Sequence, residues 1–69
     1  MLKLYPDGEG WYWYKGRMKL EESPIAAVFE DWTPLRVQNQ GGALLIILNN
    51  VFLTPWNFAG AWVPIPYPI

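Results

Sequence analysis

The first twenty-two residues have the pattern of a β-hairpin or meander. Leu2 to Tyr5 alternates as a strand does, and Pro6-Asp7-Gly8 follows as a turn, because proline presets φ and glycine tolerates positive φ. Residues 11–20 are again rich in strand-forming side chains. If they form one strand, Tyr12, Tyr14, Met18 and Leu20 share one face, and the other face carries Trp11, Trp13, Lys15, Arg17 and Lys19. A tight turn at Lys15-Gly16 would instead give two short strands, so both interpretations are β.

Residues 24–32 have the apolar spacing of a helix instead. Ser23 stands where an N-cap is needed, and Pro24 suits the first helical position. The apolar residues that follow recur at i, i+3, i+4 and i+7 and would form one helical face: Ile25, Val28, Phe29 and Trp32. Thr33-Pro34 ends the segment, because the residue before proline avoids the α region. We therefore predict a short helix over about 24–32, which only tertiary packing could hold at this length.

The second half of the chain predicts further strands and an extended tail. Residues 35–38 can form a strand, and residues 39–42 form a loop. Residues 43–48 are apolar on both faces, which is typical of a strand buried from both sides. Asn49-Asn50 can form a two-residue hairpin turn, with residues 51–54 as the returning strand. Alternating prolines in residues 64–68 exclude a central strand and favour an extended conformation.

These elements predict a mainly β fold, either a small antiparallel sheet or an SH3-like barrel, with one short helix over about 24–32. Residues 1–62 would form a single small β-rich domain, because 69 residues suffice for one domain at most. Residues 63–69 would form an extended, proline-rich C-terminal arm. Its side chains between the prolines are apolar, which favours docking into a groove of this fold or of a neighbour.

Charge is distributed very unevenly along the chain. Every Lys, Arg, Asp and Glu lies at or before Arg36, and residues 37–69 carry no charged side chain. A free domain normally spreads charge over its surface for solubility. Either the first half wraps the second and supplies the polar surface, or another molecule covers the second half. We favour the partner, because so small a first half has little surface to lend.

The composition leaves few groups able to do chemistry. The chain has no cysteine and no histidine, which excludes disulfides, Cys/His zinc sites and nucleophilic triads. Ser23 is the only serine, and the glycines match no phosphate-binding pattern. Asp7 and Glu9 flank a glycine but lack the further oxygen ligands of a Ca²⁺ loop. We therefore predict no enzyme, no cofactor and no metal site.

The sequence favours a structural protein that acts through protein–protein interaction as an assembly subunit of a larger complex, with a virus or phage particle as the leading type. Its partners would be other protein subunits in a homo- or hetero-oligomer, met by the uncharged half. The aromatic and aliphatic residues of that half supply the predicted interface anchors: Trp56, Phe58, Trp62, Ile65, Tyr67 and Ile69. We expect a cytoplasmic or virion-associated chain with no signal peptide and no transmembrane segment.

Two alternatives remain open. Stacking rings beside cations would suit single-stranded nucleic acid or carbohydrate, and that ligand face would comprise Trp11, Trp13, Lys15, Arg17 and Lys19. The same rings could equally pack in the core while the cations protect an edge strand. A net charge of −1 opposes nucleic acid as a partner. The other alternative is a small inhibitor that docks on a host enzyme through aromatic anchors.

Overall fold

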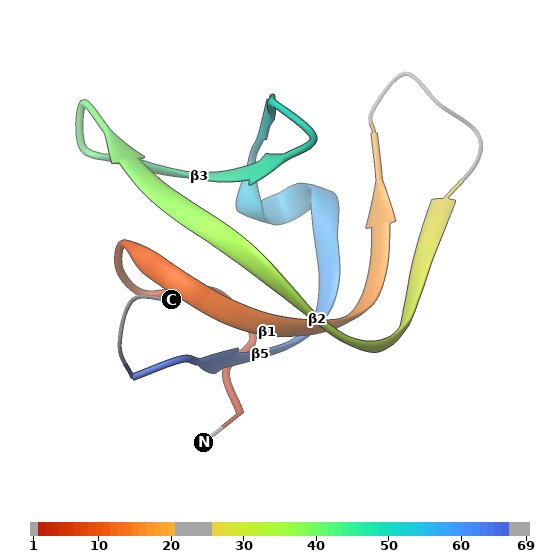
Figure 1. Ribbon diagram of the computed structural model, residues 1–69. Helices are drawn as coiled ribbons and strands as arrows, with labels where there is room; N and C mark the ends of the chain where they lie inside the picture. The colour runs from red at the N-terminus through yellow and green to blue at the C-terminus, as the bar shows by residue number, and fades with distance from the viewer. Residues whose placement is uncertain (1, 21–25, 67–69) are drawn as a thin grey trace.

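The computed structural model describes residues 2–20 and 26–66, and it shows five antiparallel strands (Figure 1). The elements follow in the order β1 (Gly10–Lys19), β2 (Ala26–Gln40), β3 (Ala43–Leu48), β4 (Val51–Leu53), the 3-10 turn η1 (Pro55–Asn57) and β5 (Phe58–Pro64). The strands lie side by side as β4-β3-β2-β1-β5, so β1 is paired on both sides. The small antiparallel sheet is thus confirmed.

Two tight turns connect β2 to β3 and β3 to β4. Gly41 and Gly42 have φ of 62° and 91°, and Asn49 and Asn50 have φ of 50° and 65°. Two-residue hairpin turns that match the twist of their strands need positive φ at both positions, and asparagine tolerates it better than most residues. The hairpin predicted at Asn49-Asn50 is therefore confirmed.

β1 is one continuous strand, so the alternative turn at Lys15-Gly16 does not form. The register against β2 shifts within it: Tyr14 lies opposite Thr33, whereas Gly16 lies opposite Phe29. Lys15 alone therefore faces three residues of β2, Glu30 to Trp32. This bulge bends β2 sharply and pushes the two adjacent acids outward at its edge.

The helix predicted over 24–32 is wrong, because residues 26–32 belong to β2. Val28 and Trp32 are 60% and 42% exposed on one face of the strand, while Phe29 packs against the core on the other. The spacing that suggested a helical face therefore spans both faces of a strand. Branched and aromatic side chains favour a pleated surface, and pairing with β1 stabilises this segment as a strand, whereas a helix this short is marginal by itself. Residues 24 and 25 lie outside the described residues.

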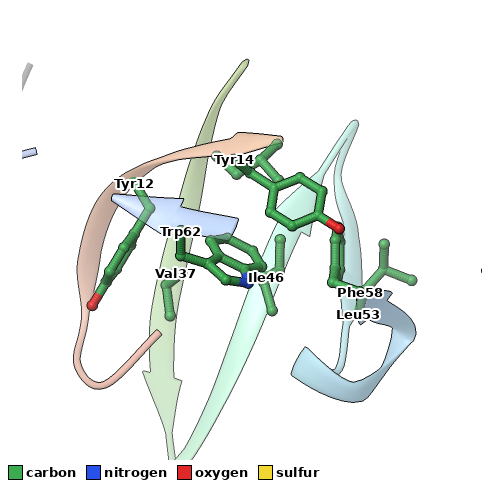
Figure 2. Packing of buried hydrophobic residues seen from close by; sticks show 8 residues of the cluster. Tyr12, Tyr14, Val37, Ile46, Leu53, Phe58 and Trp62 are labelled. Atoms are coloured by element: carbon green, nitrogen blue, oxygen red, sulfur yellow. The ribbon is translucent and has the colours of Figure 1, made fainter. Parts of the chain in front are cut away.

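Both halves of the chain contribute to the core (Figure 2). Among the described residues, three buried hydrophobic side chains come from the charged half and five from the uncharged half: Tyr12, Tyr14 and Leu35, then Val37, Ile46, Leu53, Phe58 and Trp62. Trp62 is fully buried, with its ring centroid 4.4 Å from that of Tyr14 and 5.4 Å from that of Phe58. Aromatic pairs at such distances add packing energy beyond their buried area. The first half thus covers part of the second within the molecule itself.

The last strand overlaps the start of the predicted C-terminal arm. β5 continues to Pro64, with Val63 opposite Trp13, so the first two residues of the predicted arm belong to the sheet. The Ile65 backbone N–H then donates to the Trp11 carbonyl oxygen at 2.9 Å. Proline is tolerated here because β5 is an edge strand.

Two contacts between segments far apart in the sequence hold the ends of the sheet together. Near the N-terminus the predicted strand over residues 2–5 reduces to one bridge, in which Lys3 and Trp62 exchange backbone hydrogen bonds of 2.8 and 2.9 Å. On η1, the Asn57 side-chain amide donates to the Lys19 carbonyl oxygen at 3.0 Å and so ties this turn to the end of β1.

Within residues 2–20 and 26–66, no helix has the length and apolarity to cross a bilayer.

Candidate interaction surface

The residues predicted to anchor a partner do not share one surface. Phe58 and Trp62 are 3% and 0% exposed and belong to the core of this chain, so their side chains cannot meet a partner in this fold. Trp56 is 73% exposed on η1, and Ile65 is half-buried just after β5. Tyr67 and Ile69 lie outside the described residues. Of the predicted anchors that the structure describes, only Trp56 is exposed.

The exposed apolar surface concentrates in the charged half of the chain. Among the residues that the structure describes, seven of the ten exposed large hydrophobic side chains lie before Arg36: Leu2, Leu4, Tyr5, Trp13, Leu20, Val28 and Trp32. The uncharged half contributes Val51, Phe52 and Trp56. Absence of charge along a sequence therefore does not locate the apolar surface here, because most large apolar side chains in the described part of that half are buried or half-buried.

Two of the exposed tryptophans lie together on the outer face of the sheet, which is the face turned away from the core. Trp13 of β1 is paired with Val63 of β5 on one side and with Pro34 of β2 on the other. Trp13, Trp32 and Val63 line an open hollow of about 560 Å³. We call these three residues the outer patch. It combines side chains from three adjacent strands, so the sheet itself fixes their spacing.

The cations of β1 extend along the same face. Lys15, Arg17 and Lys19 are all exposed, as their alternation with Tyr12 and Tyr14 predicts. The Lys15 ammonium nitrogen lies 5.8 Å from the centroid of the Trp32 ring, within range of a cation–π interaction. Of the predicted ligand face, Trp13 and Lys15 therefore meet at the outer patch. Trp11 is half-buried and lines a different hollow of about 410 Å³ with Arg36 and Ile65.

Acidic side chains border the outer patch on its other flank. The bulge in β2 leaves Glu30 and Asp31 exposed immediately before Trp32. The patch thus has cations on the β1 side and carboxylates at the free edge of β2. A continuous polyanion would be repelled along that edge, whereas a ligand with localised charge could use the cationic side alone.

Sequence reasoning missed two of the three residues of the outer patch. The helical spacing assigns Trp32 to the buried face of a helix, and the proline pattern assigns Val63 to the arm. The signal that could have found Val63 is the period of two through Phe58, Gly60 and Trp62, which places Ala61 and Val63 on the opposite face. Trp32 could be placed beside Trp13 only by the pairing of β1 with β2, which the local pattern does not specify.

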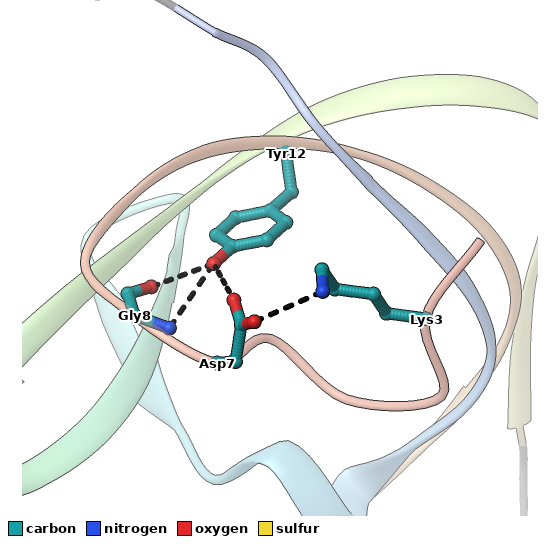
Figure 3. A network of polar contacts seen from close by, with 4 residues as sticks. All are labelled: Lys3, Asp7, Gly8 and Tyr12. Carbon is teal, nitrogen blue, oxygen red and sulfur yellow. Dashed lines mark hydrogen bonds and ion pairs between the residues drawn. The ribbon is translucent and has the colours of Figure 1, made fainter. Parts of the chain in front are cut away.

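The polar cluster near the N-terminus is structural (Figure 3). The Tyr12 hydroxyl accepts from the Gly8 N–H at 3.1 Å and lies 2.9 Å from the Gly8 carbonyl oxygen and 3.2 Å from Asp7 Oδ1. Lys3 Nζ pairs with Asp7 Oδ2 at 2.9 Å. The hydrogen bond from Lys3 lowers the pKa of Asp7, while burial raises the pKa of Tyr12. These contacts fix the Asp7-Gly8 turn against β1.

Two further observations concern metal binding and similarity to known proteins. The described part of the chain holds no group of three or more acidic, histidine or cysteine side chains that could bind a metal ion. Comparison of the chain with protein-family models, curated proteins and solved structures finds no match.

Proposed function

We propose that the chain is a non-catalytic binding module that joins a larger protein assembly through the outer patch. The observation that carries this proposal is the shared hollow of Trp13 and Trp32, two exposed indoles on neighbouring strands with Val63 beside them. The assembly role predicted from the sequence is kept. The contact surface moves from the uncharged half to the outer face of β1, β2 and β5.

The cost of exposing two tryptophan side chains to water supports a partner at the outer patch. Trp13 and Trp32 are 39% and 42% exposed, and neither belongs to the buried core cluster of the described residues. Tryptophan is among the residues most enriched at binding hot spots, where it fills a pocket that water then leaves. Because Trp13 stands on the doubly paired strand β1, its position is fixed before binding, and little ordering is needed when a partner arrives.

A peptide-display selection tests the proposal and reveals the preferred ligand sequence in the same experiment. The folded chain would be immobilised and used to select from random extended peptides, and the selected peptides would be re-measured on variants by fluorescence polarisation. Trp13→Ala with Trp32→Ala should abolish binding. Trp56→Ala is the matched control, since it removes an exposed tryptophan from η1 and should leave binding intact.

The same measurement can overturn the proposal. Peptides that bind the Trp13→Ala/Trp32→Ala variant as well as the parent chain, but lose affinity for Trp56→Ala, would place the contact on η1 and the uncharged half. Selection of no peptide that depends on Trp13 or Trp32 would remove the outer patch as a protein-binding surface.

A second candidate function rests on Lys15 beside Trp32. Aromatic rings flanked by cations stack single-stranded bases or sugar rings, and Arg17 continues the cationic row along β1. The acids in the bulge and the net charge of −1 disfavour a nucleic acid. Titration of tryptophan fluorescence with oligothymidylate, oligouridylate and a soluble oligosaccharide at low salt discriminates. Quenching that disappears in Trp13→Ala would favour this candidate.

A further inference from the structure

Resting on the proposed function, we infer that the partner of the outer patch is an extended acidic peptide segment lying on the β5 side of β1. It places one apolar side chain in the hollow of Trp13, Trp32 and Val63. Carboxylates at the second and fourth positions beyond that side chain meet Lys15 and Arg17.

The pairing of β1 with β5 provides a low track beside the two cations. Lys15 lies opposite Ala61, and Arg17 lies opposite Ala59. Both alanines are on the outer face, because Gly60 between them lies against the Tyr14 hydroxyl on the inner side. The small side chains of β5 leave room for a backbone next to the long side chains of β1. At the end of this track Val63 and Trp13 form the wall of the hollow.

Charge selects which side of β1 the segment occupies. On the β2 side, the bulge exposes Glu30 and Asp31. On the β5 side, the residues opposite Lys15 and Arg17 are uncharged alanines. A segment with carboxylates therefore gains from the cations and avoids the acids only if it lies over β5.

Spacing along the strand sets the spacing of the ligand. A strand rises roughly 3.4 Å per residue, so Trp13, Lys15 and Arg17 follow one another at intervals of about 7 Å on one face. An extended peptide has the same repeat. An apolar residue followed by acids two and four positions along therefore matches the three side chains in turn, in either chain direction.

The probe is a blocked nine-residue peptide of serines with one leucine and with glutamates at the second and fourth positions on each side of it. Its partner peptide carries lysines in place of the glutamates. Both are titrated into the full chain at low and at moderate salt, with tryptophan fluorescence as the readout. Arg17→Glu is compared with Arg36→Glu, which reverses the charge of an arginine on β2, away from the track.

The glutamate peptide should bind the parent chain more tightly than the lysine peptide, with an advantage that shrinks as salt rises. Arg17→Glu should weaken binding of the glutamate peptide by about fivefold or more. An exposed ion pair contributes up to about fivefold in affinity, and the introduced glutamate adds repulsion. Arg36→Glu should weaken that affinity much less than Arg17→Glu does.

Three results would overturn the inference, and they separate it from the proposed function. Equal binding of the two peptides that still requires Trp13 rejects the acidic partner and leaves the binding module standing. No binding of either peptide, together with selected peptides that depend on Trp13 but lack acids, does the same. Stronger quenching by oligothymidylate than by the glutamate peptide assigns the cations to nucleic acid instead.

Discussion

Gly16 of β1 lies directly opposite Gly60 of β5, and the two backbones are in contact there. A Cβ added to Gly16 would lie 2.6 Å from the Gly60 Cα and 2.9 Å from the Tyr14 hydroxyl oxygen. Gly16 also has φ of 146°, which residues other than glycine rarely adopt. The Tyr14 hydroxyl donates to the Arg17 carbonyl oxygen just beside this pair. The missing side chains thus let β5 approach the buried ring of Tyr14.

Gly60→Ala should therefore destabilise the chain severely. Its Cβ would meet the Lys15 carbonyl oxygen and the Gly16 Cα, both of them backbone atoms that cannot rotate away. Overpacking of this kind costs about 1–3 kcal/mol or more, a large part of the stability of so small a domain. Urea unfolding followed by circular dichroism measures the loss. Gly8→Ala is the control, since nothing lies within 4 Å of its added Cβ, and equal stability losses for both would contradict the close approach.

Truncation of the buried tryptophan of the uncharged half should cost far more stability than truncation of the exposed one. Trp62→Ala removes a fully buried indole and should cost about 3–5 kcal/mol, enough to unfold most of the population at 25 °C. Trp56→Ala removes a 73% exposed one and should change the free energy of unfolding by less than about 0.5 kcal/mol. Thermal melts of both variants check this. A stable, folded Trp62→Ala would refute a core built around this indole.

Stability should fall in alkaline solution because two buried phenols resist ionisation. Burial raises the pKa of Tyr12 and of Tyr14 above the ordinary value of 10.0. A raised pKa means that the folded state favours the neutral phenol. Its contribution is complete below pH 10 and is lost as the pH rises through the folded-state pKa.

Urea midpoints measured from pH 8 to pH 11.5 should therefore decline above pH 10. Tyr14→Phe should flatten the decline, because one of the two phenols is gone. Tyr5→Phe serves as the control, since Tyr5 is 58% exposed and its substitution should leave the pH profile as in the parent chain. A profile that is as steep in Tyr14→Phe as in the parent chain would count against the burial of this phenol.

Asp7 should make stability fall at the acid end of the pH range. Its pKa is lowered mainly by the hydrogen bond from Lys3, so the folded state favours the carboxylate. The contribution is present above the unfolded-state pKa and disappears as the pH falls through the folded-state value. Melting temperatures from pH 6 to pH 2 should lose part of their acid dependence in Asp7→Asn. The exposed Asp31→Asn is the control and should not alter it.

The sequence predicted most of β1 correctly because its period of two reports directly which face is buried. Tyr12 and Tyr14 point inward, and Trp13, Lys15 and Arg17 point outward, as expected. The Asn49-Asn50 turn was likewise predictable, since few residues accept positive φ twice in succession. Local chemistry decides both features, so a local pattern can reveal them.

What the sequence could not specify depends on pairing between distant segments. The spacing of Val28, Phe29 and Trp32 fits a helix as well as a strand. Backbone hydrogen bonds to β1 select the strand. The hollow at the outer patch requires Val63 and Trp32 to lie on either side of Trp13, although they are far apart in the sequence. The sequence analysis placed Phe58 and Trp62 at a partner interface, but both are buried in the core. Their burial depends on packing against distant segments, which a local pattern does not reveal.

Indole N–H signals in a ¹H–¹⁵N correlation spectrum test the binding surface most directly, since the chain has five tryptophans and each contributes one indole N–H. The peaks are assigned with single Trp→Phe variants, and the glutamate peptide is then titrated in. The Trp13 and Trp32 peaks should shift together and saturate, while those of Trp56 and Trp62 stay in place. A titration in which Trp56 shifts and Trp13 does not would contradict the outer patch as the surface that meets a partner.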